Sequence, residues 1–573
     1  MKANSINQTV TSIPSTTKTS SCNRRGFVKS LLAAGTAASF ANLASAVQPP
    51  DKGKPNTPHG NPNSRRMQAY NIRVQVATEE AQLPIPDHPD NGDESRYSNL
   101  IGSYSKGLPH NNLGEVDQNA YNTYLQALAS GAPADFERIP MGCPPPRFRL
   151  VNPQSGLAFD LEGIDSHATF MPPAPALASA EEAGEIIENY WMALTRDISF
   201  SQYDSDPLTL EAASDLSKLS DFRGPKIGSA VIPGTLFRLG FPGCTTGPYL
   251  SQFLCMNVPY GATYVEQHIR TATPGVNFMT DYTEWLNIQR GCRPTQSQQY
   301  DSSRRYVRNG RDSGQWVHVD VLHQAYFQAM LTMLAPPSTD SDQSGIGAPL
   351  DPNNPYVHSL TQDGFGAFGG PHIATLLPEV ATRALHAQWF QKWFVHRRLR
   401  PEAFAGRIHN YITGAAPQYP LGTSDLLHSS VLAKVFSQYG TYLLPMAYPE
   451  GSPLHPAYGS GHATVAGACA TILKAWFDES YVIPNPIQVS PDGLSLQPYT
   501  GAALTVGGEL NKLASNIAVS RNIAGVHWRS DAVEALKLGE AVAISVLRDQ
   551  RLTYNENFPG FTFTKFDGTR VIV

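Results

Sequence analysis

Apolar residues recur at helical spacing in several long stretches of the chain, and the segments between them are rich in proline and glycine. Residues 181–196 (EEAGEIIENYWMALTR) and 316–334 (WVHVDVLHQAYFQAMLTML) place apolar side chains three or four positions apart, which predicts two amphipathic helices. Residues 460–477 are almost wholly apolar, which predicts a helix at the centre of the core.

Further elements are predicted toward the C-terminus. A helix is expected from about Pro371 to Leu399, since Pro401 pushes the residue before it out of the helical region. Another is expected over residues 531–548, where Asp531 and Glu534 fit a capping box. The tail FTFTKFDGTRVIV predicts a hairpin with its turn at Asp567-Gly568. We therefore expect a mainly α fold of two packed helical bundles with long loops and a small C-terminal β-hairpin.

The first 46 residues have the pattern of an export signal. Arg24 and Arg25 precede an apolar stretch over residues 30–43, and Ala44-Ser45-Ala46 supplies an A-x-A cleavage site. This order is typical of a twin-arginine signal, and the apolar stretch is too short to span a bilayer. The alternative is a buried N-terminal helix preceded by chance arginines. The signal predicts an exported protein, periplasmic or extracellular, with no membrane anchor in its mature form.

The rest of the chain is expected to divide into three parts. Residues 47–66 carry almost no apolar side chains and are predicted to be a disordered linker. Residues 67–310 are expected to form an N-terminal helical and loop-rich region, and residues 311–573 a C-terminal helical bundle. The net charge of −5 gives no reason to expect a nucleic-acid partner.

Removal of the signal would take Cys22 away and leave five of the six cysteines. There is no C-x-x-C pair, which disfavours a cysteine zinc site or a thioredoxin motif. One or two disulfides are possible in an oxidising compartment, and we expect them among Cys244, Cys255 and Cys292. Cys469 lies in an Ala-rich helical stretch and is expected to be a buried small hydrophobic residue.

Candidate chemistry is concentrated in three segments of the C-terminal third. They are KWFVHRRLRP, with Lys392 and Arg400; HPAYGSGH, with His455, Ser460, Gly461 and His462; and SRNIAGVHWRSD, with Arg521, His527 and Asp531. A tetrahedral oxyanion needs fixed cations and convergent N–H donors, which the lysine, the two arginines and a helix N-terminus at Ser460 and Gly461 can provide. Together the segments predict an oxyanion site.

Each segment alone has a less specific interpretation. A basic run near a helix end is usually a solvated cap, Ser-Gly-His is usually a helix start, and Asp531 could be a plain N-cap. His372, His386 and His396 are expected to be structural histidines. Residues 364–369 match G-x-G-x-x-G but lack a preceding strand, so a tight loop is the better interpretation.

The three segments, in this order and spacing, resemble the superfamily of vanadium-dependent haloperoxidases and phosphatidic-acid-type acid phosphatases. Seven residues separate Lys392 from Arg400, as in the haloperoxidases, although Gly459 stands where many members have proline. The resemblance to algal-type bromoperoxidases covers residues 362–372, 392–402, 450–477 and 509–531, and the tail around residues 554–558 and 565–569.

The resemblance implies a role for each residue. His527 would be the single protein ligand to vanadium, with Asp531 either orienting it or only capping a helix. The vanadate oxygens would be held by Lys392, Arg400, Ser460, Gly461 and Arg521. His462 would be the general acid/base, Lys392 would draw charge from peroxide, and His455 would be a second active-site histidine that favours bromide over chloride.

The implied activity is vanadate-dependent oxidation of bromide or iodide by hydrogen peroxide, which yields hypohalous acid for halogenation of a small organic acceptor. Homo-oligomers and structural calcium occur among the relatives, but no calcium ligands can be assigned from this sequence. One alternative is an acid phosphatase in which His527 is the nucleophile and His462 protonates the leaving group. Another is a secreted oxyanion-binding protein without turnover, which His462 disfavours.

Overall fold

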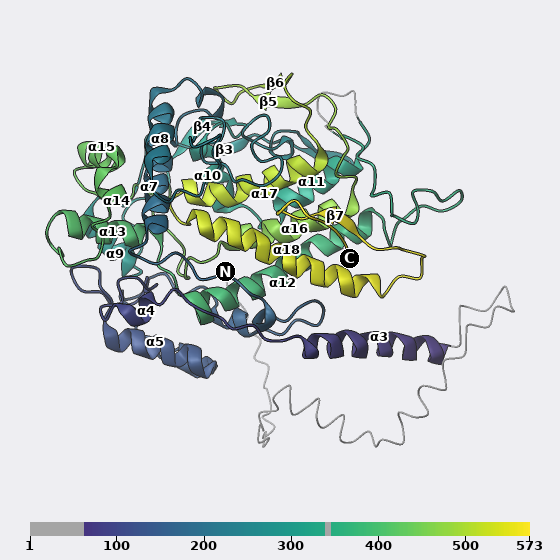
Figure 1. Ribbon diagram of the computed structural model, residues 1–573, viewed down its shortest axis with the longest axis horizontal. Coiled ribbons are helices and arrows are strands. Elements are labelled where there is room, and N and C mark those ends of the chain that lie inside the picture. Colours follow the sequence, from purple (N-terminus) through teal and green to yellow (C-terminus); the bar gives the residue numbers. More distant parts are fainter. Residues whose placement is uncertain (1–61, 338–344) are drawn as a thin grey trace, which may run out of the picture. The chain divides into compact units, whose positions relative to one another are not determined.

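A computed structural model of the protein describes residues 62–337 and 345–573. Helices dominate these residues, and the strands form two-stranded antiparallel sheets (Figure 1). The predicted mainly α fold is therefore confirmed, including the C-terminal hairpin of β7 (Thr562–Thr564) and β8 (Arg570–Ile572). Residues 75–573 form one compact unit.

Irregular segments join the helices. Those before the site segments are α3 (Pro62–Gln82), α4 (Asp93–Arg96), α5 (Gln118–Ser130), α6 (Pro133–Phe136), η1 (Pro153–Leu157), η2 (Ser166–Ala168), α7 (Ala180–Thr195), η3 (Phe200–Gln202), α8 (Pro207–Lys218), η4 (Gln252–Leu254), α9 (Tyr282–Gln289), α10 (Gly310–Val319) and α11 (Gln324–Leu334). They are followed by α12 (Gly370–Phe390), η5 (Gln391–His396), α13 (Pro401–Ile412), α14 (Ser424–His428), α15 (Ser430–Tyr439), α16 (Gly461–Trp476), α17 (Val506–Ile523) and α18 (Arg529–Arg551).

The remaining strands form three short antiparallel pairs. They pair β1 (Val258–Tyr260) with β2 (Thr263–Val265), β3 (Ile269–Ala272) with β4 (Tyr300–Arg305), and β5 (Ile487–Val489) with β6 (Leu496–Pro498). None was predicted, because such short strands carry little periodic signal.

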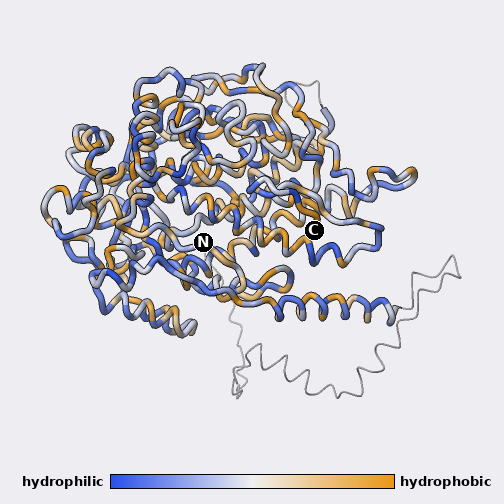
Figure 2. Tube along the Cα trace, in the orientation of Figure 1, coloured by the Kyte–Doolittle hydropathy of each residue, from blue (hydrophilic) through white to orange (hydrophobic). Residues whose placement is uncertain are grey.

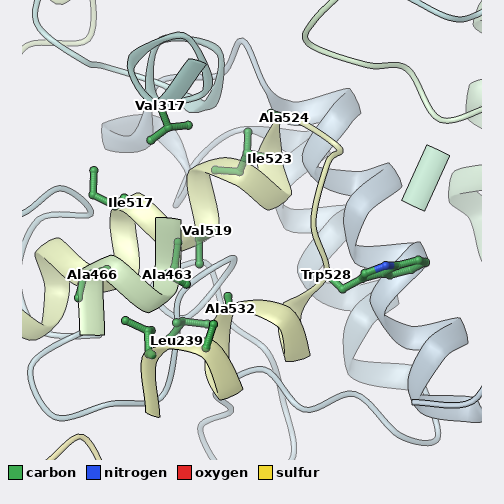
Figure 3. Packing of buried hydrophobic residues seen from close by; sticks show 14 of the residues in the cluster. Leu239, Val317, Ala463, Ala466, Ile517, Val519, Ile523, Ala524, Trp528 and Ala532 are labelled. Carbon is green, nitrogen blue, oxygen red and sulfur yellow. The ribbon is translucent and has the colours of Figure 1, made fainter. Parts of the chain in front are cut away.

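Helix α16 lies at the centre of the main core, as its apolar sequence predicts. It packs against α12, α17 and α18, and nearly all of its side chains are buried. Figure 2 shows hydrophobic stretches along these central helices. Figure 3 shows small side chains of α16, such as Ala463 and Ala466, close to Ala532 of α18 and Val519 of α17.

Two glycines allow α16 and α18 to pack with their backbones in contact. A Cβ atom on Gly467 would lie 2.0 Å from the Leu536 carbonyl oxygen, and a Cβ atom on Gly539 would lie 2.0 Å from the Thr464 carbonyl oxygen. No side chain fits at either position without separating the helices. The same packing brings the two N-termini together, where the Ser460 amide donates to the Asp531 carbonyl at 3.1 Å.

The structure corrects three predicted helix limits. The helix expected over residues 316–334 is two helices, α10 and α11, because Asp320 has an extended backbone between them. The helix expected to reach Leu399 ends at His396, after the π-helical turn η5, since Arg397 has a left-handed φ of 37°. Helix α18 begins at Arg529, so Asp531 is the third helical residue and not the N-cap.

Expectations for the N-terminus are only partly within the described residues. The signal at residues 1–46, with Cys22, and linker residues 47–61 lie outside them. Residues 62–66 of the expected linker are helical, as the start of α3, so the linker prediction is wrong there. The boundary at residue 310 stays a prediction. No helix of residues 62–337 and 345–573 combines the length and apolar character needed to cross a bilayer.

The predicted disulfide pairing is wrong. Cys292 is bonded to Cys143, whereas Cys244, Cys255 and Cys469 are free and buried. The bonded residues are 149 positions apart, and sequence spacing alone gives no indication that they meet. Burial raises the pKa of the Cys244 and Cys255 thiols to about 12, which suits inert core residues. Cys469 is a buried core residue, as expected.

We expect Gly467→Ala to destabilise the protein by about 3 kcal/mol or more, because the added methyl group forces α16 and α18 apart. Chemical denaturation measures this change. Gly314→Ala is the control, since Gly314 is also helical and buried but its Cβ atom would lie 3.8 Å from the Ala524 side chain. That control should gain about 0.5–1 kcal/mol from helix propensity. Equal effects of the two substitutions would contradict the close-packing explanation.

Candidate functional site

The three predicted segments meet at one cavity of about 420 Å³. Five of the predicted site residues line this cavity: His455, Gly461, His462, Arg521 and His527. Lys392, Arg400 and Ser460 are fully buried beside it, where Lys392 and Arg400 bind backbone carbonyls of residues 455–457 and Ser460 caps α16. The structure thus brings together every residue that the sequence predicts for the site.

The three site cations, Lys392, Arg400 and Arg521, donate mainly to backbone carbonyl groups. Lys392 Nζ donates to the carbonyl oxygens of Pro456 and Ala457, both at 2.9 Å. Arg400 donates to the carbonyl oxygens of His455 and Val526 at 2.9 and 2.6 Å. Among the described residues, none of the three cations lies within ion-pair distance of a carboxylate. Their positive charge is therefore buried without a direct counter-ion.

Arg521 follows the same pattern. Its Nη1 donates to the Val317 carbonyl at 2.8 Å, at the C-terminal end of α10. Its buried Nε has no hydrogen-bond partner among the described residues. An unmade hydrogen bond on a buried guanidinium is costly, so the arrangement favours an acceptor that enters from the cavity.

Neighbouring buried cations are paired differently. Arg398 binds Glu182, Glu185 and Asp531, and Arg529 binds Glu188. Lys106 binds Glu402. These pairs stabilise the surrounding helices, whereas the three site cations remain available for an anion.

The buried environment shifts the pKa values of the site cations. Burial, and then the charge of Arg400, hold the pKa of Lys392 well below its usual range. Burial lowers the pKa of Arg400 to about 10. An anion bound among them would offset both effects, because an opposite charge favours the protonated forms.

The N-terminus of α16 completes the cationic side of the site. The Ser460 side chain caps the helix by accepting from the Ala463 amide at 3.4 Å. The N–H groups of the first turn have no acceptor within the helix, so they favour an anion at this end. Gly461 fits against Trp389, since a Cβ atom there would lie 3.1 Å from the indole ring.

The partners of His527 define its tautomer. Its Nδ1 lies 2.7 Å from Asp531 Oδ2, which can only accept when ionised, and its Nε2 lies 2.9 Å from Arg400 Nη1, which can only donate. The proton is therefore on Nδ1, and Nε2 carries the lone pair that a metal would need. Burial and the charge of Arg400 hold the pKa of His527 well below its usual range, so the ring is neutral.

Asp531 does more than cap a helix. Its Oδ2 accepts from the Trp528 amide at 3.2 Å as well as from His527, and its Oδ1 accepts from Arg398 at 2.9 Å. Asp531 thus both orients His527 and caps the start of α18, the two roles that the sequence left open.

His455 contacts the same guanidinium group as His527, through the other terminal nitrogen of Arg400. Its Nδ1 is 2.9 Å from Arg400 Nη2, and its ring centroid is 4.9 Å from that of Trp389. Burial, and then the charges of Arg400 and Lys392, hold the pKa of His455 well below its usual range. His455 is thus a neutral ring at the cavity wall.

His462 has a partner that the sequence did not reveal. Its Nε2 lies 3.0 Å from Oδ1 of Asp320, the residue that directly follows α10. Burial lowers the pKa of His462, and Asp320 works against this effect. No motif marks Asp320; the only signal is a charged residue within an apolar helical pattern.

The other histidines singled out in the sequence lie outside the cavity lining. His386 contacts Asp160 at 3.0 Å, His372 accepts from the Phe368 amide, and His396 packs edge-on against Tyr458. The glycines of residues 364–369 form a tight loop before α12, where a Cβ atom on Gly369 would lie 2.4 Å from the Gly364 carbonyl oxygen. Among the described residues, no three His, Cys, Asp or Glu side chains are grouped so as to hold a metal ion.

Comparison with known proteins gives a consistent result. Residues 374–555 match a family model described as the VCPO second helical-bundle domain. The chain is 37% identical over 610 residues to a vanadium-dependent bromoperoxidase of Corallina pilulifera, covering 90% of this chain and 99% of that relative. It is 36% identical over 528 residues to a vanadium-dependent bromoperoxidase of Ascophyllum nodosum, covering 88% and 92% of the two chains.

A solved structure is similar over almost the whole length. It is the homohexameric structure of the second vanadate-dependent bromoperoxidase from Ascophyllum nodosum. The TM-score is 0.83 at 30% identity, and the alignment covers 92% of this chain and 95% of the other.

Asp531→Asn should weaken orthovanadate binding by roughly 10–100-fold, as is usual when the partner of a metal-ligating histidine is lost. An amide can donate to Nδ1, which would move the ring proton to Nε2. Equilibrium dialysis measures the affinity. Asp312→Asn is the control, because Asp312 is also a buried third helical residue and pairs with Arg308 at 3.1 Å, away from the cavity. Unchanged affinity in Asp531→Asn would contradict the tautomer assignment.

Proposed function

This chain belongs to the family of vanadium-dependent bromoperoxidases, and we propose that it uses vanadate to oxidise bromide, and iodide, with hydrogen peroxide. The observation that carries this proposal is the buried group of Lys392, Arg400 and Arg521, which have no carboxylate partner among the described residues, beside a neutral His527 whose Nε2 lies 2.9 Å from Arg400 Nη1. A tetrahedral oxyanion supplies the missing negative charge.

The residues fit vanadate. His527 would be the protein ligand through Nε2, and Lys392, Arg400, Ser460, Gly461 and Arg521 would hold the oxygens. The Nε of Arg521, which has no partner among the described residues, and the N-terminus of α16 offer donors, and Gly461 lies in the cavity lining.

Bound vanadate would act as a Lewis acid that polarises the O–O bond of hydrogen peroxide. His462 would take a proton from arriving peroxide and return one later, and Asp320 keeps its ring oriented. Lys392 would supply positive charge to the reacting oxygens. In the net reaction, halide, peroxide and one proton give hypohalous acid and water, and the acid then halogenates a small organic acceptor. His455, neutral and tilted against Trp389, supports a preference for bromide.

Assembly and location form part of the proposal. We propose a homo-oligomer, supported by the homohexameric relative. We also propose export through the twin-arginine signal of residues 1–46. The Cys143–Cys292 disulfide supports an oxidising compartment such as the periplasm or the exterior. Structural calcium stays a proposal without assigned ligands.

Bromination of monochlorodimedone by the mature protein, with bromide and peroxide, tests the function. The rate should require orthovanadate and fall when phosphate competes for the same site. Absence of bromination together with hydrolysis of phosphate esters would overturn the proposal. That result would make the protein an acid phosphatase in which His527 is the nucleophile.

Substitutions of His462 and His527 should affect different properties, the bromination rate and the vanadium content. His462→Ala should lose bromide oxidation by on the order of 10²-fold or more but retain vanadate, since it removes an acid/base without a ligand. His527→Ala should lose bound vanadium. Vanadium content by mass spectrometry and the bromination rate measure the two effects, with His386→Ala as a control. Full vanadium retention in His527→Ala would refute the ligand assignment.

A further inference from the structure

One wall of the cavity is apolar and leads from the surface to the oxyanion site. Its outer part is formed by Phe148 and Val151, and Val151 is 38% exposed. Trp389 forms the inner part of this wall. Its indole N–H donates to the Val151 carbonyl at 3.0 Å, and its ring centroid lies 4.9 Å from that of His455. A ligand that lies along the wall therefore reaches from the surface to the residues around the oxyanion.

The outer end of this wall carries positive charge. Arg149 follows Phe148, is exposed and belongs to the cavity lining. The guanidinium group of Arg293 lies over the Phe148 ring, 4.4 Å from its centroid, which orients the ring. Among the described residues, no carboxylate lies within ion-pair distance of either arginine. Arg149 is therefore free to bind an anionic group of a ligand.

The inner part of the cavity carries two carboxylates. Asp320 and Glu450 belong to its lining and contact His462 and His318 at 3.0 and 2.6 Å. They repel an organic carboxylate placed beside them, because like charges at close range are unfavourable. A ligand with one anionic end and one apolar end is thus favoured in a single orientation. Its anionic end lies at Arg149, and its apolar end lies along the wall.

The proposed reaction supplies an electrophile for such a ligand. When hypobromous acid meets an electron-rich aromatic ring, a ring carbon bonds to bromine and the Br–O bond breaks. The displaced ring proton joins the departing hydroxide to form water. The cavity, of about 420 Å³, falls within the range of roughly 300–1,000 Å³ that is usual for small-molecule sites. Its combination of an apolar wall and a few polar groups is also usual for such sites.

We propose that the cavity binds an electron-rich aromatic carboxylate as its organic acceptor, with the carboxylate on Arg149 and the ring along the wall of Phe148, Val151 and Trp389. The planar guanidinium group can engage both carboxylate oxygens. Bromination then takes place on the bound molecule, before hypobromous acid leaves the cavity. The inference rests on the proposed function, because it presupposes that hypobromous acid forms at the oxyanion site.

A competition between two acceptors tests the inference. The acceptors are para-hydroxyphenylpropionate and its amide, which share one ring and differ in charge. The parent holoenzyme receives both, with bromide and peroxide, and mass spectrometry measures the ratio of the two brominated products. Hypobromite added to the same mixture without enzyme gives the reference ratio. We expect the enzyme to favour the carboxylate by about 3- to 5-fold over this reference, the size of one solvent-facing charge pair.

Substitutions of Arg149 should change this preference without changing vanadium content. Arg149→Gln should return the product ratio to the reference, and Arg149→Lys should keep part of the preference, since it retains the charge but not the planar fork. Arg304→Gln is the matched control, because Arg304 of β4 is also exposed but lies outside the cavity lining, and it should behave like the parent. Added potassium nitrate should reduce the preference of the parent, because salt screens an exposed charge.

The outcomes separate this inference from the proposed function. A parent enzyme that does not brominate would overturn both. A parent that brominates with the reference ratio would show that hypobromous acid reacts after its release, and this result would overturn the acceptor site alone. A preference that survives in Arg149→Gln, or that salt does not reduce, would also contradict the assignment of the carboxylate to Arg149.

Discussion

The site depends on one electrostatic constraint: three buried cations must be held in place without direct contact from a carboxylate. Backbone carbonyls meet this need, since they orient an ammonium or guanidinium group without cancelling its charge. The carbonyl groups belong to residues 455–457, Val317 and Val526. The carboxylates of the region bind other groups: Glu182, Glu185 and Asp531 bind Arg398, Glu188 binds Arg529, Glu402 binds Lys106, and Asp320 and Glu450 contact histidines. This separation leaves the positive charge for an oxyanion.

Sequence reasoning identified the site because its residues come in short motifs of fixed spacing. His527 and Asp531 are four residues apart across the start of α18, and Ser460 and Gly461 begin an apolar helix, so local geometry already determines much of their arrangement. Asp320 could not be found in this way. Apolar periodicity continues through Val319 and Leu322, and the partner of Asp320 is His462, which is distant in sequence.

Other features escaped prediction for the same reason, since they depend on tertiary contacts. The apolar sequence of α16 showed that it is central but not that Gly467 and Gly539 are needed where it packs against α18. By local propensity, glycine within a helix is only a weakness. Likewise, Cys143 and Cys292 meet because the segment after Cys143 packs beside the end of α9.

The Cys143–Cys292 bond has a consequence for how the enzyme could diversify. Phe148, Arg149 and Val151 form part of the cavity lining just after Cys143, and the Val151 amide donates to the Leu454 carbonyl. This segment is anchored at one end by a covalent bond and carries none of the oxyanion-binding groups. Its side chains can therefore be exchanged without altering the catalytic frame. A change of organic acceptor, in evolution or in directed engineering, has its most permissive starting point there.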